Sequence, residues 1–252
     1  MYNDWFTIGG ITIHGYGVMI AIGILMAYFT GEKLGKKHNL DTDQIDTIIF
    51  LVLIGGFAFS KLVYCLTVFD QFVKDPLSVL GSGGWVVYGG IVGGLLTGWL
   101  YCKKMNLDFM AYFNVLAPCI ALAQGFGRIG CFFAGCCYGI ETHTVLDVHF
   151  PDGSLGPGSA IGALPTQLIM SAGDFLIFGI LLKVLANEKT KDTTAAMYLV
   201  LYSLGRFLIE FVRGDTARGF IGPLSTSQFI AVFTFLLGMY MIWRHQQKNA
   251  VL

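Results

Sequence analysis

Charged side chains are scarce in this sequence of 252 residues. Asp, Glu, Lys and Arg together make up 13% of it, whereas an ordinary soluble domain carries about 25%. Too little charge is present to cover a water-facing surface, so a soluble enzyme is nearly excluded. The sixteen basic residues equal the sixteen acidic residues in number, and a net charge of zero argues against a nucleic-acid partner.

Other patterns are also missing. No segments of about ten residues alternate between apolar and polar side chains, which excludes an outer-membrane β-barrel. No basic residue precedes the first apolar block and no small-residue cleavage site closes it, so we expect this block to remain in the mature protein. No clear internal repeat is present, which weakens a transporter interpretation without removing it.

The sequence has long apolar blocks instead, and hydrophobic residues make up 55% of it. Each block is apolar around most of its circumference and long enough for the roughly 20 helical residues that cross a bilayer. Lipid offers the backbone no hydrogen-bond partner, so each block should be a helix. We predict an all-α fold with seven transmembrane helices, in a single domain over residues 1–252. The predicted spans are 13–31, 45–68, 84–102, 109–130, 165–186, 195–212 and 226–243.

Lys and Arg are distributed unevenly between these spans. Ten of the sixteen follow the first, third, fifth and seventh spans or lie in the last turn of the fifth, three lie on the opposite side, and the other three lie within or at the ends of spans. Basic residues concentrate on the cytoplasmic side, so we predict that the N-terminus is outside and the C-terminus is in the cytoplasm. The ten are Lys33, Lys36, Lys37, Lys103, Lys104, Lys183, Lys189, Lys191, Arg244 and Lys248; the three outside are Lys74, Arg213 and Arg218; the three in spans are Lys61, Arg128 and Arg206.

Ionisable residues inside a span cost about 2.5 kcal/mol or more at the bilayer centre, so each needs a partner or a task. Asp174 has no firm partner in the sequence. Arg206, Glu210 and Arg213 have the spacing i, i+4 and i+7, which places them on one helix face. They form either a salt bridge that stabilises this face or, since two arginines share one carboxylate, a binding site for an anion such as a lipid phosphate.

Polar and glycine-rich features of five spans fall at the predicted outer ends of those spans. This convergence predicts a site for a lipid head group of the outer leaflet and for a second substrate from outside. The glycines of the third span serve either close helix packing or the approach of backbone N–H groups to a phosphate. The features are His14, Tyr16, Gly84, Tyr88, Gly89, Gly90, the stretch from Arg128 to Gly139, Pro165, Thr166, Gln167, Arg206, Glu210 and Arg213.

Three of the six cysteines lie together at the predicted outer end of the fourth span. There Cys131 can form a disulfide with Cys136 or Cys137 in an oxidising compartment. The spacing Cys-x4-Cys-Cys is not a usual zinc-ligand pattern, so we expect a disulfide or buried thiols rather than a metal completed by His143 or His149. A catalytic thiol is a further alternative. The remaining cysteines, which we interpret as small apolar side chains, are Cys65, Cys102 and Cys119.

The stretch Gly127-Arg128-Ile-Gly130-Cys-Phe-Phe-Ala-Gly135 resembles the signature of the bacterial prolipoprotein diacylglyceryl transferase family. Further motifs follow the order of that family along nearly the whole chain, and seven spans with the N-terminus outside are also its architecture. Single motifs of this kind are weak, but seven in order are specific. The other six are His14-Gly-Tyr16-Gly17, Lys61-Leu-Val-Tyr64, Gly84 to Gly94, Pro165-Thr-Gln167, Tyr202 to Arg213 and Ser227-Gln228.

The resemblance implies a transferase of the bacterial cytoplasmic membrane. Its donor is phosphatidylglycerol, its acceptor is the lipobox cysteine of a preprolipoprotein signal peptide, glycerol phosphate is released, and no cofactor or metal is expected. It assigns Arg128 and Arg206 to the phosphate and Glu210 to orienting Arg206 and Arg213. The catalytic residues that it implies are Arg128, Arg206 and Tyr88, and the substrate-binding residues are His14, Tyr16, Lys61, Tyr64, Gly89, Gly90, Gln167, Tyr202, Glu210 and Arg213.

The chain also departs from the pattern of this family. Tyr88 stands where many members have His, and Cys131 and Cys136 replace an Asn and a Glu. Met170 stands where a Glu is common, and the Pro that usually follows the last arginine is absent after Arg213. These changes indicate a divergent, cysteine-bearing branch. A transferase with another acceptor, and a non-enzymatic transporter or redox protein, remain alternatives.

Overall fold

The computed structural model describes residues 3–215 and 219–251, so Arg218 lies outside the described residues. The chain divides into two compact units, which are described separately below. The larger unit comprises Met1–Gly31 and Phe113–Leu252, and the smaller unit comprises Glu32–Tyr112. The single domain over 1–252 stays a prediction.

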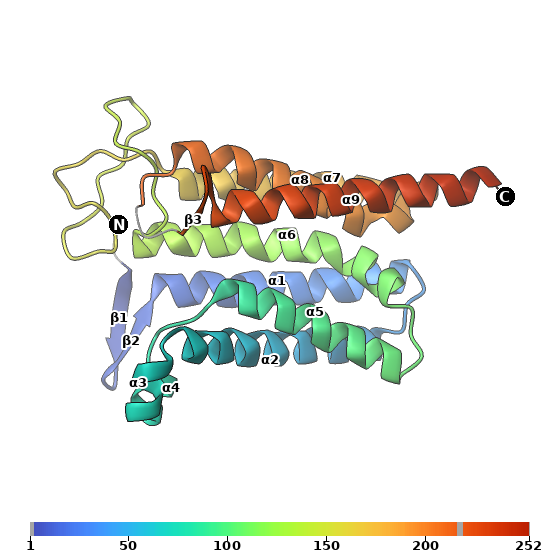
Figure 1. Ribbon diagram of the computed structural model, residues 1–252, viewed down its shortest axis with the longest axis horizontal. Helices are drawn as coiled ribbons and strands as arrows, with labels where there is room; N and C mark the ends of the chain where they lie inside the picture. The colour runs from blue at the N-terminus through green and yellow to red at the C-terminus, as the bar shows by residue number, and fades with distance from the viewer. Residues whose placement is uncertain (1–2, 216–218, 252) are drawn as a thin grey trace. The chain divides into compact units, whose positions relative to one another are not determined.

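Each of the seven predicted spans is a helix, which confirms a mostly helical fold (Figure 1). The helices are α1 (Gly15–Lys37), α2 (Thr42–Thr67), α5 (Val87–Lys104), α6 (Phe109–Ala134), α7 (Thr166–Ala186), α8 (Thr194–Ile209) with the 3-10 turns η1 (Lys191–Thr193) and η2 (Glu210–Val212), and α9 (Thr226–Val251).

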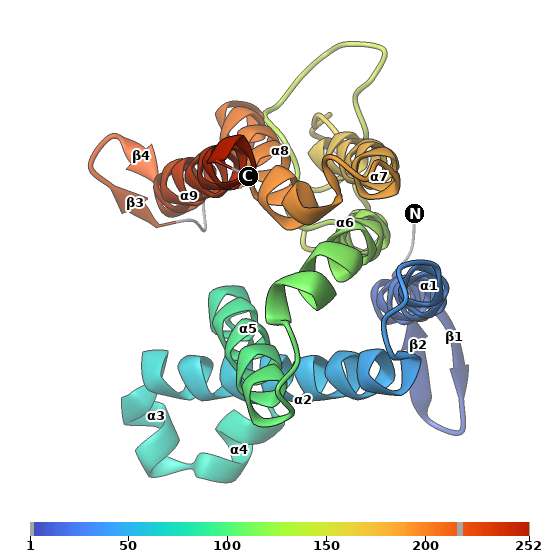
Figure 2. The ribbon, with the colours of Figure 1, turned by 90° about the vertical axis from the view of Figure 1, so that its right-hand side faces the viewer.

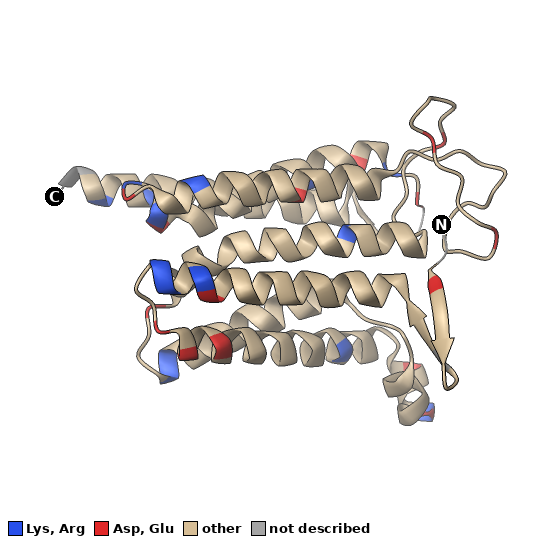
Figure 3. Cartoon of the chain, turned by 180° about the vertical axis from the view of Figure 1, so that it is seen from behind, with Lys and Arg blue, Asp and Glu red and all other residues tan. Residues whose placement is uncertain are grey.

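Among the described residues, six helices are long and apolar enough to cross a membrane. The predicted span that does not qualify is α5. It has 18 residues, of which five are glycines and the last two are lysines. These residues lower the mean hydropathy of the helix. Figure 3 shows that the charged residues of the helices lie mostly near helix ends.

Two short hairpins and two short helices were not predicted. The first hairpin pairs β1 (Asp4–Ile8) with β2 (Ile11–His14), so the predicted first span began two residues inside a strand. The second hairpin pairs β3 (Phe220–Ile221) with β4 (Leu224–Ser225). In the smaller unit, α3 (Phe69–Lys74) and α4 (Pro76–Gly81) lie between α2 and α5.

The helices α6, α7, α8 and α9 of the larger unit lie side by side (Figure 2), and side-chain hydrogen bonds join them. Ser171 on α7 donates to the carbonyl of Gly125 on α6 over 2.9 Å, and the hydroxyls of Ser203 on α8 and Thr234 on α9 are 2.6 Å apart. The Asn114 side chain of α6 accepts from a backbone N–H in the first turn of α8 over 2.8 Å. It therefore satisfies one of the donors that a helix N-terminus leaves unpaired.

The smaller unit is built on a close contact between α2 and α5. A Cβ added to Gly93 of α5 would lie 2.3 Å from Cβ of Phe59, and one added to Gly55 of α2 would lie 2.1 Å from Oγ1 of Thr97. Neither position has room for a methyl group. These glycines therefore allow the two helix backbones to approach, as small residues commonly do in membrane proteins.

Candidate functional site

The predicted charged face of α8 forms a buried network in the larger unit. The Arg206 guanidinium donates to Oε2 of Glu210, and its NH2 donates to Oγ of Ser227 over 2.7 Å. NH1 of Arg213 lies 4.0 Å from the same Glu210 oxygen. The exposed fraction of the side chain is 2% for Glu210 and 9% for Arg213, so these charges interact with little screening by water.

Asp215 supplies a second carboxylate to this network. Nε of Arg213 donates to Oδ1 of Asp215 over 2.8 Å, and NH2 of Arg213 donates to Oδ2. This is the bidentate geometry that suits a guanidinium and a carboxylate. Among the residues that the structure describes, two arginines thus face two carboxylates. The structure favours the salt-bridge alternative at Arg213.

Backbone pairing holds Arg213 in place. Residues Gly139 and Arg213 form an isolated antiparallel bridge, and the N–H of Gly214 donates to the carbonyl of Tyr138 over 3.0 Å. A Cβ on Gly214 would lie 2.2 Å from the Gly139 carbonyl oxygen. The segment after α6 and the segment after η2 can therefore lie this close only with glycine at 214.

The N-terminus of α7 fixes the backbone of the adjacent cysteines. Nε2 of Gln167 donates to the Cys136 carbonyl over 2.8 Å, and Oγ1 of Thr166 donates to the Cys137 carbonyl over 2.7 Å. Cys137 has φ of 64°, a left-handed conformation that costs a non-glycine residue free energy. Both anchoring side chains are fully buried, so surrounding structure holds this strained residue.

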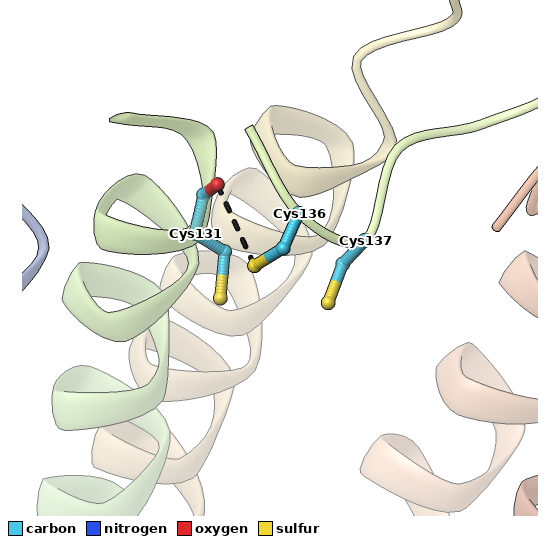
Figure 4. A group of neighbouring side chains, drawn as sticks. All are labelled: Cys131, Cys136 and Cys137. Atoms are coloured by element: carbon cyan, nitrogen blue, oxygen red, sulfur yellow. Dashed lines mark hydrogen bonds between the residues drawn. The ribbon is translucent and has the colours of Figure 1, made fainter. Parts of the chain in front are cut away.

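The thiols of Cys131, Cys136 and Cys137 form a cluster in which the three Sγ atoms lie within 4.8 Å of one another (Figure 4). All three are free, half-buried thiols, which is one of the two expected states. Hydrogen bonds from the Cys131 and Cys136 thiols, followed by the attraction of Arg213 and Arg128, lower the pKa of Cys137. Hydrogen bonding within the cluster raises the pKa of Cys136.

Arg128 on α6 lies beside this thiol cluster. Within residues 3–215 and 219–251, its guanidinium has no hydrogen-bond partner and no carboxylate within 4.0 Å. It interacts electrostatically with Tyr202 and Cys131 and, more weakly, with the buried Asp174. Tyr16 of α1 also interacts with Arg128 and with the thiols. Arg128 is therefore a cation that can bind an anion without first breaking an ion pair.

Lys61 has a different environment, in the smaller unit. Its buried Nζ donates to the carbonyls of Ser82 and Gly84 over 2.7 and 3.2 Å, and it lies 3.4 Å from the Ser82 hydroxyl. It also lies 5.1 Å from the centre of the Tyr64 ring and 4.8 Å from that of Trp85. All three of its donors have protein partners, so Lys61 holds the loop that leads into α5.

The first turn of α5 carries the other predicted residues of this unit. Tyr88 is 39% exposed, and Gly89 is buried against α2, where an added Cβ would lie 2.9 Å from the carbonyl oxygen of Phe59. An added Cβ on Gly90 would lie 3.3 Å from the carbonyl oxygen of Gly56. Close contact with α2 therefore favours helix packing over phosphate binding at both glycines.

Comparison with known proteins identifies the family. A family model described as prolipoprotein diacylglyceryl transferase matches residues 3–244, which is nearly the whole chain. The chain belongs to the prolipoprotein diacylglyceryl transferase family. The resemblance drawn from the seven motifs is therefore confirmed.

Individual relatives agree with this family. A phosphatidylglycerol–prolipoprotein diacylglyceryl transferase of Clostridium tetani is 41% identical over 238 residues, covering 94% of each protein. A second, from Clostridium perfringens, is 38% identical over 234 residues, covering 92% of this chain and 91% of the relative. A third, from Gloeobacter violaceus, is 29% identical over 250 residues, covering 96% and 92%.

In this member of the transferase family, the predicted site residues fall into three groups. One group is held together in the larger unit, around the thiol cluster and the charged face of α8. His14 is separate from it, because it lies on β2 with its side chain half exposed and its Nδ1 2.6 Å from Oδ1 of Asp4. The first group is Tyr16, Arg128, Gln167, Tyr202, Arg206, Glu210 and Arg213, and the group in the smaller unit is Lys61, Tyr64, Tyr88, Gly89 and Gly90.

Some of the polar partners in this network were not predicted from the sequence. Asp215 lies beyond the helical periodicity, so nothing in the spacing links it to Arg213. Ser227 was noted only as part of a motif. The sequence does carry a local signal for the position of Ser227, because Ser225 and Gln228 form a capping box at the start of α9. The N–H of Ser225 donates to Oε1 of Gln228, and the N–H of Gln228 donates to Oγ of Ser225, each over 3.1 Å.

Proposed function

We propose that this protein transfers a diacylglyceryl group from phosphatidylglycerol to the lipobox cysteine thiol of a preprolipoprotein signal peptide. A thioether forms and glycerol phosphate leaves. Relatives that are 41% and 38% identical to this chain are named for this transfer, which supports the proposal. The observation that carries it is Arg128, a guanidinium without a carboxylate partner among the described residues, next to tyrosines and thiols.

Arg128 fits the chemistry of the donor. A guanidinium binds two phosphate oxygens through parallel, charge-assisted hydrogen bonds. As the bond between the glyceryl carbon and the phosphate oxygen breaks, negative charge grows on the phosphate, and a cation already in place stabilises that charge without rearranging. Tyr16 and Tyr202 interact with the same guanidinium, so we assign them to contacts with the head group.

Arg206 is the second phosphate-binding residue in this proposal. Its side chain is 13% exposed, and Glu210 and Ser227 hold it from two sides. Arg213, Glu210 and Asp215 act as positioning residues, because they fix the end of α8 and the backbone bridge to Gly139. Since these ion pairs are buried, they define one arrangement of the charged side chains.

We further propose that the chain crosses the bacterial cytoplasmic membrane seven times, with α5 as the additional span and the N-terminus outside. The uneven distribution of Lys and Arg supports this orientation. It is tested by labelling Ser154→Cys and Asn187→Cys from outside with a membrane-impermeant thiol reagent, measured against the unmodified chain. We expect additional labelling at 154 only, and additional labelling at 187 alone would invert the topology.

The activity is tested with purified protein, phosphatidylglycerol vesicles and a lipobox peptide, by following the peptide mass and the release of glycerol phosphate. Arg128→Ala should lower turnover by roughly 10²–10³, the loss typical of removing one group that stabilises developing charge. Arg244→Ala is the matched control, because Arg244 is exposed near the end of α9 and should retain activity. Release of glycerol phosphate without peptide modification would indicate another acceptor, and no release would refute the proposal.

A further inference from the structure

The thiol cluster is a predicted feature that the proposed transfer leaves without a role. Its three Sγ atoms lie within 4.8 Å of one another, and their side chains extend toward the same side of the segment (Figure 4). Zinc binds thiolate sulfur at about 2.3 Å, which for tetrahedral geometry separates two sulfur ligands by about 3.8 Å. Each pair of sulfurs therefore needs to move closer together by about 1 Å at most, and rotation of the cysteine side chains can supply a movement of this size.

We propose that Cys131, Cys136 and Cys137 bind a thiophilic divalent cation of the zinc type, and that its fourth coordination position takes the acceptor thiol. The inference rests on the proposed function and adds to it the group that activates the acceptor. Three protein ligands with one open position are the pattern of catalytic rather than structural zinc sites. Cys131 lies in the last turn of α6, and Cys136 and Cys137 lie in the segment that follows this helix directly.

The backbone of this segment is arranged before any ligand binds. Side chains of α7 hold the carbonyls of Cys136 and Cys137 over 2.8 and 2.7 Å, and Cys137 is kept in a left-handed conformation with φ of 64°. A loop free to relax would lose that conformation. Strain that surrounding structure maintains is concentrated at functional sites, and fixed ligand positions lower the entropic cost of binding a metal ion.

The local charge also suits an ion bound by thiolates. Three thiolates and one divalent cation leave a net charge of −1, which becomes −2 when the acceptor thiolate binds. Arg128 lies three residues before Cys131 on α6, which places the two on neighbouring positions of the helix surface. Arg128 and Arg213 both attract the Cys137 sulfur. The same arginine that binds the donor phosphate thus lies beside the metal-bound acceptor.

The chemical step is balanced without any redox partner. On binding to the metal the acceptor thiol loses its proton to water, since a coordinated thiol is deprotonated. A sulfur lone pair then attacks the glyceryl carbon of phosphatidylglycerol, and a carbon–sulfur bond forms. The carbon–oxygen bond breaks, and its electron pair stays on the phosphate oxygen, which leaves as glycerol phosphate beside Arg128. One thiol proton is released for each thioether formed.

The two histidines of the following segment are engaged elsewhere. His149 has its Nδ1 2.9 Å from the carbonyl oxygen of Ser159. The His143 side chain is 85% exposed, and its Nε2 lies 3.7 Å from Glu141. Neither is among the ligand atoms that gather with the three sulfurs, so the fourth position stays available to the substrate.

The first experiment measures metal binding alone. The protein is purified with a phosphine reductant, freed of metal with a chelator, and titrated with Zn²⁺ and with Co²⁺. We expect one ion per chain, with the thiolate-to-cobalt charge-transfer absorption and intense visible bands of a tetrahedral cobalt site. Binding should be lost in Cys131→Ala, Cys136→Ala and Cys137→Ala. It should persist in the matched control Cys102→Ala, which changes a buried cysteine of α5.

The second experiment measures transfer to the lipobox peptide with and without Zn²⁺ at pH 6. A free cysteine has a pKa of about 8.5, so only about one molecule in 300 is a thiolate there, and metal-free protein should transfer on the order of 10² times more slowly. Zn²⁺ should restore the rate. Full activity of metal-free protein, no metal binding by reduced protein, or full activity of protein with a Cys131 disulfide would each overturn the metal site and leave the transferase function standing. Metal binding without any transfer would contradict the proposed function instead.

Discussion

Glu210→Gln is the substitution that best tests how much the buried ion pairs of α8 stabilise the protein. The Glu210 carboxylate is 2% exposed and lies 4.0 Å from NH1 of Arg213, besides its hydrogen bond from Arg206. At an effective dielectric constant of about 20, one pair at this distance interacts by about 4 kcal/mol. Breaking a buried pair by changing one partner costs about 3–5 kcal/mol.

The lower end of that range applies here, because both arginines retain another partner. Arg213 keeps the bidentate contact with Asp215, and Arg206 keeps the Ser227 hydroxyl. We expect Glu210→Gln to lower the free energy of unfolding by about 3 kcal/mol, which is about a hundredfold change in the ratio of folded to unfolded protein. Transfer activity should fall as well, since Arg206 loses its main orienting contact.

The measurement is thermal or denaturant unfolding in detergent micelles, with Glu188→Gln as the matched control. Glu188 pairs with Lys191 on the exposed loop after α7, where its side chain is 81% exposed. Exposed pairs contribute little, so the control should unfold as the unmodified protein does. If Glu210→Gln is no more destabilising than Glu188→Gln, then Glu210 is not the desolvated bridge between two cations that its contacts indicate.

Three further outcomes follow from single contacts. Lys61→Met should lower stability by about 3 kcal/mol in the same unfolding assay, because it leaves two backbone carbonyls of the loop before α5 without their charged donor; an unchanged midpoint would contradict this role. Gly214→Ala should cost about 1–3 kcal/mol by overpacking, since its Cβ would lie 2.2 Å from the Gly139 carbonyl oxygen, and transfer should fall with it. Hydrogen bonds from the backbone and hydroxyl of Ser159 lower the pKa of Asp152 below its ordinary 3.8, so this contact is complete above that value and is lost as the pH falls through the lowered one. Limited proteolysis at pH 7 should therefore cut the segment between α6 and α7 faster in Asp152→Asn, and equal rates would refute the contact.

The helices were predictable because their signal is local. A bilayer span must be long, apolar and hydrogen-bonded within itself, so residue order alone locates it, and all seven predicted blocks are helices. The same holds for Arg206 and Glu210, whose spacing brings them together along α8 and its 3-10 extension, whereas Arg213 lies just past that extension in extended backbone and not on the predicted helix face. The hairpins were missed because strands of two to five residues are too short to show a periodicity.

Residue order alone was therefore enough to locate the apolar helices, their order along the chain, and the motifs that the prolipoprotein diacylglyceryl transferase family shares. How the charges pair is visible only in the folded chain. Arg213 pairs with Asp215, and Lys61 donates hydrogen bonds to the loop before α5. Arg128 has no carboxylate partner in the described part of the chain, and three thiols lie together on a backbone that α7 holds in place. The reason is that pairing depends on distances between segments remote in sequence, and residue order constrains such distances only through the packing of the whole unit.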